Sequence, residues 1–202
     1  MKKYIVECIG TFFLVLTVAL TGNPIAIGFI LMAMVYMGGY ISGAHYNPAV
    51  TVALWVLDKI KPGEAMRYIG AQIGGGFMAA GVYAFLKQDF FIPGPGVGVS
   101  MIQALLVEVL FTFALTSVVL HVAATDKTKN NQYYGLAIGM TLLAGAFAAG
   151  PISGGALNPA VGVSPLLFDI SAISSHLSSM MLYSSGPVAG GLLAGLVYRK
   201  LK

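Results

Sequence analysis

The distribution of apolar and polar residues divides the chain into six long apolar stretches joined by short polar connections. These stretches cover residues 4–22, 25–42, 66–86, 101–123, 133–150 and 178–198. A helix needs about 20 predominantly apolar residues to cross the hydrocarbon core of a bilayer. The pattern therefore predicts six transmembrane helices.

Two further apolar segments are too short to cross a membrane. They run from Asn47 to Leu57 and from Asn158 to Phe168, and each begins with Asn followed by Pro. Asn is a favoured helix N-cap and Pro is well tolerated at the first helical position. Because a full span needs about twice this length, we expect two re-entrant half-helices.

Composition also favours a membrane protein. Of the 202 residues, 57% are hydrophobic and only 9% are charged, which is far from the usage of soluble domains. The start of the chain is similar to a signal peptide. However, Glu7 interrupts its apolar run and a similar segment recurs inside the chain, so residues 1–22 are interpreted as a permanent span.

The basic residues carry a topology signal. If the N-terminus is cytoplasmic, every Lys and Arg except Lys87 lies on the cytoplasmic side, as the positive-inside rule requires. Both termini are then cytoplasmic, in a cytoplasmic (inner) membrane. The net charge of +4 forms no basic patch, which argues against a nucleic-acid partner.

The two halves of the chain repeat the same order of parts. Glu7 in Glu-Cys-Ile-Gly-Thr-Phe-Phe corresponds to Glu108 in Glu-Val-Leu-Phe-Thr-Phe, and the Gly/Ala-rich segment 68–83 corresponds to 183–198. Three spans per half imply that the second half is inverted. We predict an all-α membrane protein with one domain, 1–202, built from inverted repeats at about 1–90 and 100–202. The half-helices then meet N-terminus to N-terminus near the midplane.

Glycines at four-residue spacing predict close approach between helices in lipid. Three such pairs are present: Gly70/Gly74, Gly135/Gly139 and Gly191/Gly195.

The non-helical stretches 38–46 and 150–157 cannot face lipid, because their backbone polar groups would lack partners there. We expect them to line a polar pathway with a ladder of carbonyl groups, those of Gly43, Ala44, His45, Gly154 and Ala156. The amides of Asn47 and Asn158 would donate at its centre. The positive ends of two half-helix dipoles would repel cations and protons, so the pathway suits neutral solutes.

These features together resemble the aquaporin, or major intrinsic protein, family. They are the two boxes Asn47-Pro48-Ala49 and Asn158-Pro159-Ala160, the Ser-Gly steps before them, Glu7, Glu108, Gln72 and Pro187. The resemblance implies a homotetramer with one pore in each protomer. It also implies that Glu7 and Glu108 brace the re-entrant loops, although a proton relay is an alternative for ionisable groups in spans.

The chain departs from the family pattern at the filter. Most members have Arg directly after the second box, whereas this chain has Val161, and family spacing places Ile27, Ala146 and Gly155 around it. The resemblance thus implies a wide, apolar selectivity filter without charge, similar to bacterial members associated with arsenite. The Asp of glycerol facilitators is also missing, since Gly162 stands in its place.

The predicted function is a passive channel for small uncharged solutes: water, polyols and amides such as glycerol and urea, and neutral metalloid acids such as arsenous acid. The alternatives are a water-selective pore and a proton-coupled transporter that uses Glu7 or Glu108. A hydrophobic constriction that conducts little is also possible in physical terms.

His45 has two interpretations, as a gate that responds to protonation in the cytoplasmic vestibule and as a brace of the loop. We expect His121 and His176 to be ordinary interfacial residues.

An enzyme is not expected. The lone Cys8 provides neither a disulfide nor a thiolate metal site, and the sequence contains no metal cluster, nucleotide loop or nucleophile–base pair. We therefore expect no metal and no cofactor. The short outer loops likewise leave little surface for an adhesion role.

Overall fold

The computed structural model describes all residues, 1–202, and its architecture is entirely helical. Six long helices are α1 (Lys2–Thr21), α2 (Pro24–Ser42), α4 (Pro62–Lys87), α5 (Met101–Ala123), α6 (Tyr134–Ser153) and α8 (Leu177–Leu201). Two short helices are α3 (Pro48–Val56) and α7 (Pro159–Phe168), and two 3-10 turns are η1 (Asp126–Thr128) and η2 (Ile170–Ala172). All six long helices are long and apolar enough to span a membrane. The predicted fold class is confirmed. The non-helical stretches are shorter than expected, because α2 continues to Ser42 and α6 to Ser153, which makes 38–42 and 150–153 helical.

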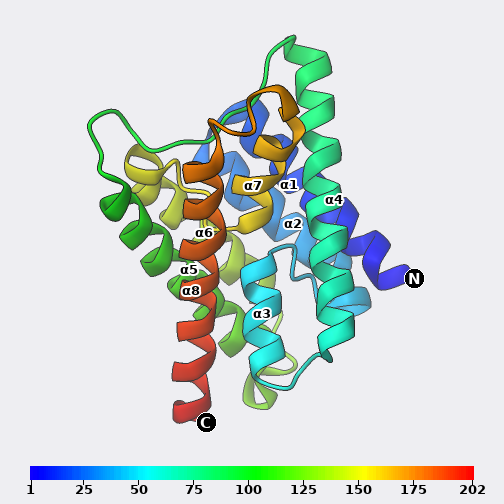
Figure 1. The fold of residues 1–202 in the computed structure, drawn as a ribbon. Coiled ribbons are helices and arrows are strands. Elements are labelled where there is room, and N and C mark those ends of the chain that lie inside the picture. The colour runs from blue at the N-terminus through cyan, green and yellow to red at the C-terminus, as the bar shows by residue number, and fades with distance from the viewer.

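The two short helices lie inside the bundle and point away from each other. In Figure 1, α3 extends from the middle of the molecule toward one end and α7 extends toward the other end, with the long helices around them. Their N-termini face each other at the centre, and the two helices are in contact there. This is the arrangement expected for half-helices that enter from opposite faces.

Each half-helix packs mainly against a long helix of the other repeat. The first half-helix, α3, packs mainly on α8 of the second repeat, and α7 packs mainly on α4 of the first. Glycines permit both contacts: a Cβ at Gly191 would lie 2.5 Å from the Ala49 carbonyl oxygen, and one at Gly76 would lie 3.0 Å from that of Ala160. The position of each box therefore depends on the opposite half of the chain.

The predicted small-residue contacts are present in part. Gly139 packs against α2, where its Cβ would lie 2.5 Å from the Gly28 carbonyl oxygen, and Gly135 packs against the ring of Tyr36. Gly70 and Gly74 on α4, by contrast, have no atom from another part of the chain within 4 Å. This side of α4 faces outward, so the close helix approach expected for that pair stays a prediction.

Candidate channel pore

Each half-helix begins with a capped Asn-Pro-Ala turn. Asn47 and Asn158 have extended backbones, with φ of −153° and −162°, and each side-chain Oδ1 accepts a hydrogen bond from a backbone N–H two residues later. The distances are 2.8 Å to Ala49 N and 2.9 Å to Ala160 N. The cap fixes the side chain, because Oδ1 is held by the helix and Nδ2 must point elsewhere.

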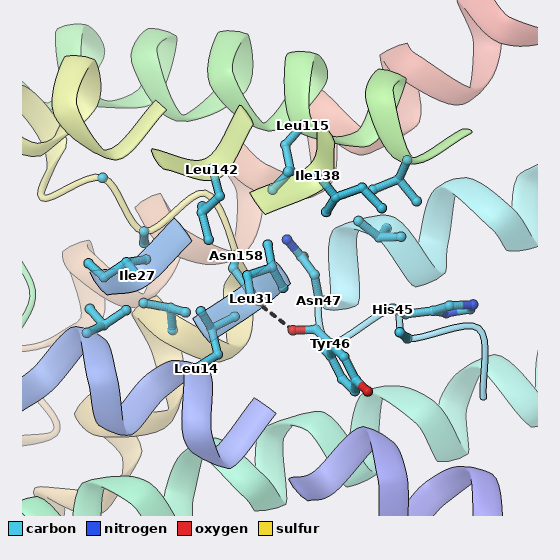
Figure 2. A pocket seen from close by; sticks show the side chains of 17 residues that line it. Leu14, Ile27, Leu31, His45, Tyr46, Asn47, Leu115, Ile138, Leu142 and Asn158 are labelled. Carbon is cyan, nitrogen blue, oxygen red and sulfur yellow. Dashed lines mark hydrogen bonds between the residues drawn. The ribbon is translucent and has the colours of Figure 1, made fainter. Parts of the chain in front are cut away.

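The two asparagines are also tied crosswise to the opposite loop. Asn47 Nδ2 donates to the Leu157 carbonyl at 2.9 Å, and Asn158 Nδ2 donates to the Tyr46 carbonyl at 2.8 Å. An amide carries two N–H donors, so each asparagine keeps one N–H for a solute. The pair thus provides two fixed donors at the point where the half-helices meet, as Figure 2 shows.

Glu7 holds the first loop from inside α1. Its Oε1 accepts from Ser42 Oγ at 2.6 Å and from His45 N at 3.0 Å, while its Oε2 accepts from Tyr46 N at 2.7 Å and from Gln72 Nε2 at 2.8 Å. The side chain is fully buried. Four donors surround the carboxylate, which is how a buried acceptor of this kind is satisfied without a cation.

Glu108 holds the second loop in the same way but with fewer partners. Oε1 accepts from Ser153 Oγ at 2.6 Å and from Ala156 N at 3.0 Å, and Oε2 accepts from Leu157 N at 2.7 Å. The position that corresponds to Gln72 is Pro187, which has no donor. The two halves therefore share the brace but differ in its polar surroundings.

The braces hold the loops in a left-handed conformation. Tyr46 and Leu157, each directly before a box, have φ of 47° and 49°, and Ala44 has φ of 49°. Such conformations cost about 1–3 kcal/mol for residues other than glycine and persist only where the surroundings impose them. The N–H groups of Tyr46 and Leu157 are those that Glu7 and Glu108 bind, so the glutamates stabilise the strained residues directly.

Tyr46 occupies a slot that two glycines leave open. A Cβ at Gly10 would lie 2.1 Å from its ring, and a Cβ at Gly38 would lie 1.9 Å from its hydroxyl oxygen. The hydroxyl donates to the Met34 carbonyl at 2.9 Å. This ring anchors the loop whose carbonyl receives Asn158.

Between the loops and the surrounding helices lies a narrow cavity. Of its 17 lining residues 13 are hydrophobic, and the other four are His45, Asn47, Gly155 and Asn158. No Asp, Glu, Lys or Arg lines it. Its volume is about 20 Å³, and a water molecule needs at least about 10–15 Å³. The lining is apolar, and the wide filter expected from the sequence stays a prediction.

The residues expected at the filter are not all at the cavity. Ile27, Gly155 and Val161 line it, whereas Ala146 does not, although it is buried. On α6 the cavity is lined instead by Ile138 and Leu142, whose longer side chains fill the space.

Of the loop residues whose carbonyls were expected to line the pathway, some border a cavity and one does not. Ala44, His45 and Ala156 line the cavity, and Gly43 lines the adjoining vestibule. Gly154 lines neither, because it caps α6 at φ 87° and packs against Gly94 and the Tyr183 hydroxyl. Its expected place in the pathway is therefore not found.

His45 lies at the junction of this cavity and a larger vestibule of about 390 Å³. Its Nδ1 lies 3.1 Å from Thr51 Oγ1, which in turn receives Gln72 Nε2 at 3.0 Å. The backbone N–H of His45 is thus braced by Glu7 while its ring borders the vestibule, and gating by protonation stays a prediction.

The other two histidines lie outside the pore. His121 Nδ1 is 2.8 Å from the Ser117 carbonyl oxygen on α5. His176, in the loop before α8, has Nε2 3.0 Å from Asp169 Oδ2. Hydrogen bonds from Ser171 and His176 lower the pKa of Asp169 below its usual range. This pair fastens the end of α7 to the start of α8.

Several pore residues escaped the sequence reasoning. They are Tyr46 and the aliphatic residues Leu14, Leu31, Val50, Leu115, Ile138 and Leu142. In an apolar span no local signal separates a lumen-facing leucine from a lipid-facing one. Their symmetric placement in the two repeats was the one usable signal.

Two re-entrant half-helices that meet at paired asparagines, inside a bundle of six spans, define a membrane channel of the inverted-repeat class. The chain belongs to the major intrinsic protein family, because the sequence model of that family matches residues 1–198. This is a family of channels that includes aquaporins and aquaglyceroporins, not of enzymes.

Known relatives agree with this placement. The chain is 36% identical over 220 residues to a probable aquaporin NIP-type from Nicotiana alata, an alignment that covers 100% of this chain and 78% of that protein. It is also 36% identical over 220 residues to glycerol uptake facilitator protein-like 6 from Lactiplantibacillus plantarum, covering 98% and 97%. The crystal structure of the aquaglyceroporin from Plasmodium falciparum has the same fold, with a TM-score of 0.81, 20% identity and coverage of 99% and 96%.

Proposed function

We propose that this protein is a passive channel for water and for small uncharged solutes such as glycerol, urea and neutral metalloid acids, with an apolar filter at Ile27, Gly155 and Val161. The observation that carries the proposal is the asparagine pair, which presents two fixed donors inside a lining without charged side chains. Such a site replaces hydrogen bonds that a neutral solute loses on leaving water. It offers an ion nothing comparable.

Proton coupling through the buried glutamates is disfavoured by their position. Neither Glu7 nor Glu108 lines the cavity, and each of their four carboxylate oxygens already accepts at least one hydrogen bond from the braced loops or α4. A relay would need a path from these oxygens to water. The contacts instead support a structural role for both residues.

Val161 replaces a long cation with a short apolar side chain at the outer part of the pore. Arg would bring a fixed charge and several donors. Without it, cation exclusion rests on the two half-helix N-termini, each equivalent to roughly half a positive charge, and on the apolar walls. This supports a filter that selects by neutrality rather than by hydrogen-bond geometry.

A water-selective pore is the second candidate, and the small cavity favours it. A volume of about 20 Å³ is close to the roughly 10–15 Å³ that one water molecule needs. Passage of glycerol requires aliphatic side chains to move aside. The two candidates therefore differ in whether the pore widens.

The setting of the channel is part of the proposal. We propose that the protein lies in the cytoplasmic membrane with both termini in the cytoplasm. The reason is the positive-inside rule, since Lys2 and Lys3 lie at the start of α1, and Arg199 and Lys200 lie at the end of α8. We also propose a homotetramer of protomers that each contain one pore.

Stopped-flow light scattering on proteoliposomes tests the function. Shrinkage in a sucrose gradient reports water flow, and re-swelling in glycerol, urea or arsenous acid reports solute flow. We expect both to exceed the rates of empty liposomes. The Val161→Arg variant should reduce solute flow about tenfold or more while retaining water flow, since Arg adds bulk and donors at the filter.

Val161→Met is the matched control, because it adds length without charge or donors. Water flow with every solute excluded in the wild type would support the water-selective candidate instead. Equal solute flow in the wild type and Val161→Arg would contradict a filter at this position.

A further inference from the structure

The cavity lining follows the inverted repeat, and its four leucines form two corresponding pairs. Leu14 on α1 corresponds to Leu115 on α5, since both follow the buried glutamate at the same place. Leu31 on α2 corresponds to Leu142 on α6, since both precede the Asn-Pro-Ala box at the same place. We call these four residues the leucine collar.

The collar surrounds the asparagine pair. In Figure 2, Ile27 lies at one end of the cavity and His45 at the other, while the four leucines and both asparagines lie between them. On α2, Leu31 is one turn, about 6 Å, deeper than the filter residue Ile27. The collar is thus distinct from the filter that the family pattern locates around Val161.

The leucines are as deeply buried as the filter residues Val161 and Ile27, which are 3% and 7% exposed. The exposed fractions of the leucines are 2% for Leu14, 3% for Leu115, 4% for Leu142 and 5% for Leu31. At the outer end the lining includes Gly155, which has no side chain, and Ala146 does not reach it. The middle therefore contains more side-chain volume than the outer filter.

The collar leaves a solute few hydrogen-bond partners besides the two asparagines. Leucine offers no hydrogen bond, so a solute here depends on the single free N–H of each asparagine and on loop carbonyls. A polar group left without a partner in an apolar site is costly. A solute with several hydroxyl groups meets this cost at the same place where it meets the steric limit.

We propose that the leucine collar, and not the filter around Val161, sets the upper size limit of the conducted solute. The leucines must change rotamer to admit anything larger than water, and their number and symmetry make this the step that discriminates water from polyols. This inference rests on the proposed channel function and identifies the residues that determine its specificity.

The test measures water and glycerol flow in proteoliposomes that contain the wild type, Leu31→Ala/Leu142→Ala or Val161→Ala. The double variant should raise the ratio of glycerol to water permeability about tenfold or more, because it opens the steric limit. Val161→Ala should leave the ratio within about twofold. Leu31→Phe, which fills the same space, should lower glycerol flow below that of the wild type.

Opposite effects of the double alanine variant and of Leu31→Phe on glycerol flow cannot arise from misfolding alone. Leu110→Ala is the matched control, since Leu110 on α5 is 53% exposed and lies outside the cavity, and it should behave as the wild type. A rise in Val161→Ala with no change in the collar variants would overturn the inference while the channel function stands. Absence of water flow in every variant would overturn the channel function itself.

Discussion

At the scale of single residues, two buried carboxylates that do not line the cavity hold the loops that form it. Glu7 and Glu108 each accept hydrogen bonds from a serine and from two backbone N–H groups of a re-entrant loop. The bonded residues Tyr46 and Leu157 have left-handed backbones, which the carboxylates stabilise. Their carbonyls in turn orient the asparagine amides.

Removal of the Glu108 carboxylate should destabilise the protein strongly. Glu108→Ala leaves the N–H groups of Ala156 and Leu157 and the Ser153 hydroxyl without their acceptor. Each unsatisfied buried donor costs about 1–3 kcal/mol. Thermal unfolding in detergent should show a much lower midpoint than that of the wild type.

Tyr183→Phe is the matched control for that experiment. It removes one hydrogen bond, from the Tyr183 hydroxyl to the Ser153 carbonyl, beside the same carboxylate, and should cost about 1 kcal/mol. A midpoint for Glu108→Ala that equals that of Tyr183→Phe would argue against the bracing role.

At the scale of elements, glycines decide how closely the half-helices approach the opposite repeat. Gly191→Ala should displace α3, because the new Cβ would lie 2.5 Å from the Ala49 carbonyl oxygen and backbone cannot give way as a side chain can. Overpacking costs about 1–3 kcal/mol. Since α3 starts at Asn47, water flow in proteoliposomes should fall together with the thermal midpoint.

Gly70→Ala on α4 provides the comparison, because no atom from another part of the chain lies within 4 Å of its Cβ position. Alanine should leave stability unchanged or raise it by up to about 1 kcal/mol through helix propensity. Equal losses in both variants would show that glycine spacing, and not the contact seen at Ala49, controls these positions.

The elements themselves were largely predictable from the sequence. Apolar length determined six spans and two half-helices, and Asn47-Pro48 and Asn158-Pro159 located the half-helix starts to the residue. Helix α4 begins at Pro62 rather than near 66, because proline starts the helix within a polar segment. The spacing of Gly70 and Gly74 could not reveal that they face outward, since the same spacing serves contacts inside and outside a protomer.

The candidate site was predictable only in part. The Asn-Pro-Ala boxes and the glutamates carry polar signals in an apolar background, and they were identified. The leucine collar carries no polar signal. Every face of each span is apolar, so the hydrophobic pattern does not show which side faces the pore. Cavity width depends on how four such side chains meet, which is a property of packing and not of any one segment.

At the scale of the whole molecule, the inverted repeat places two equal half-helices against each other and makes the lining nearly symmetric. The chain thereby forms a pathway whose centre is built by both halves and whose walls carry no charged side chain. We expect a pathway of this kind to conduct solutes down their gradient without coupling to an ion.

The most direct test of this claim is urea or glycerol flow into proteoliposomes, measured with and without an imposed pH gradient. A passive channel predicts entry above that of empty vesicles, at a rate proportional to the solute gradient, unchanged by the pH gradient and ending at equal concentrations. Accumulation of solute above the outside concentration when protons flow inward would contradict it and would return Glu7 and Glu108 to a coupling role.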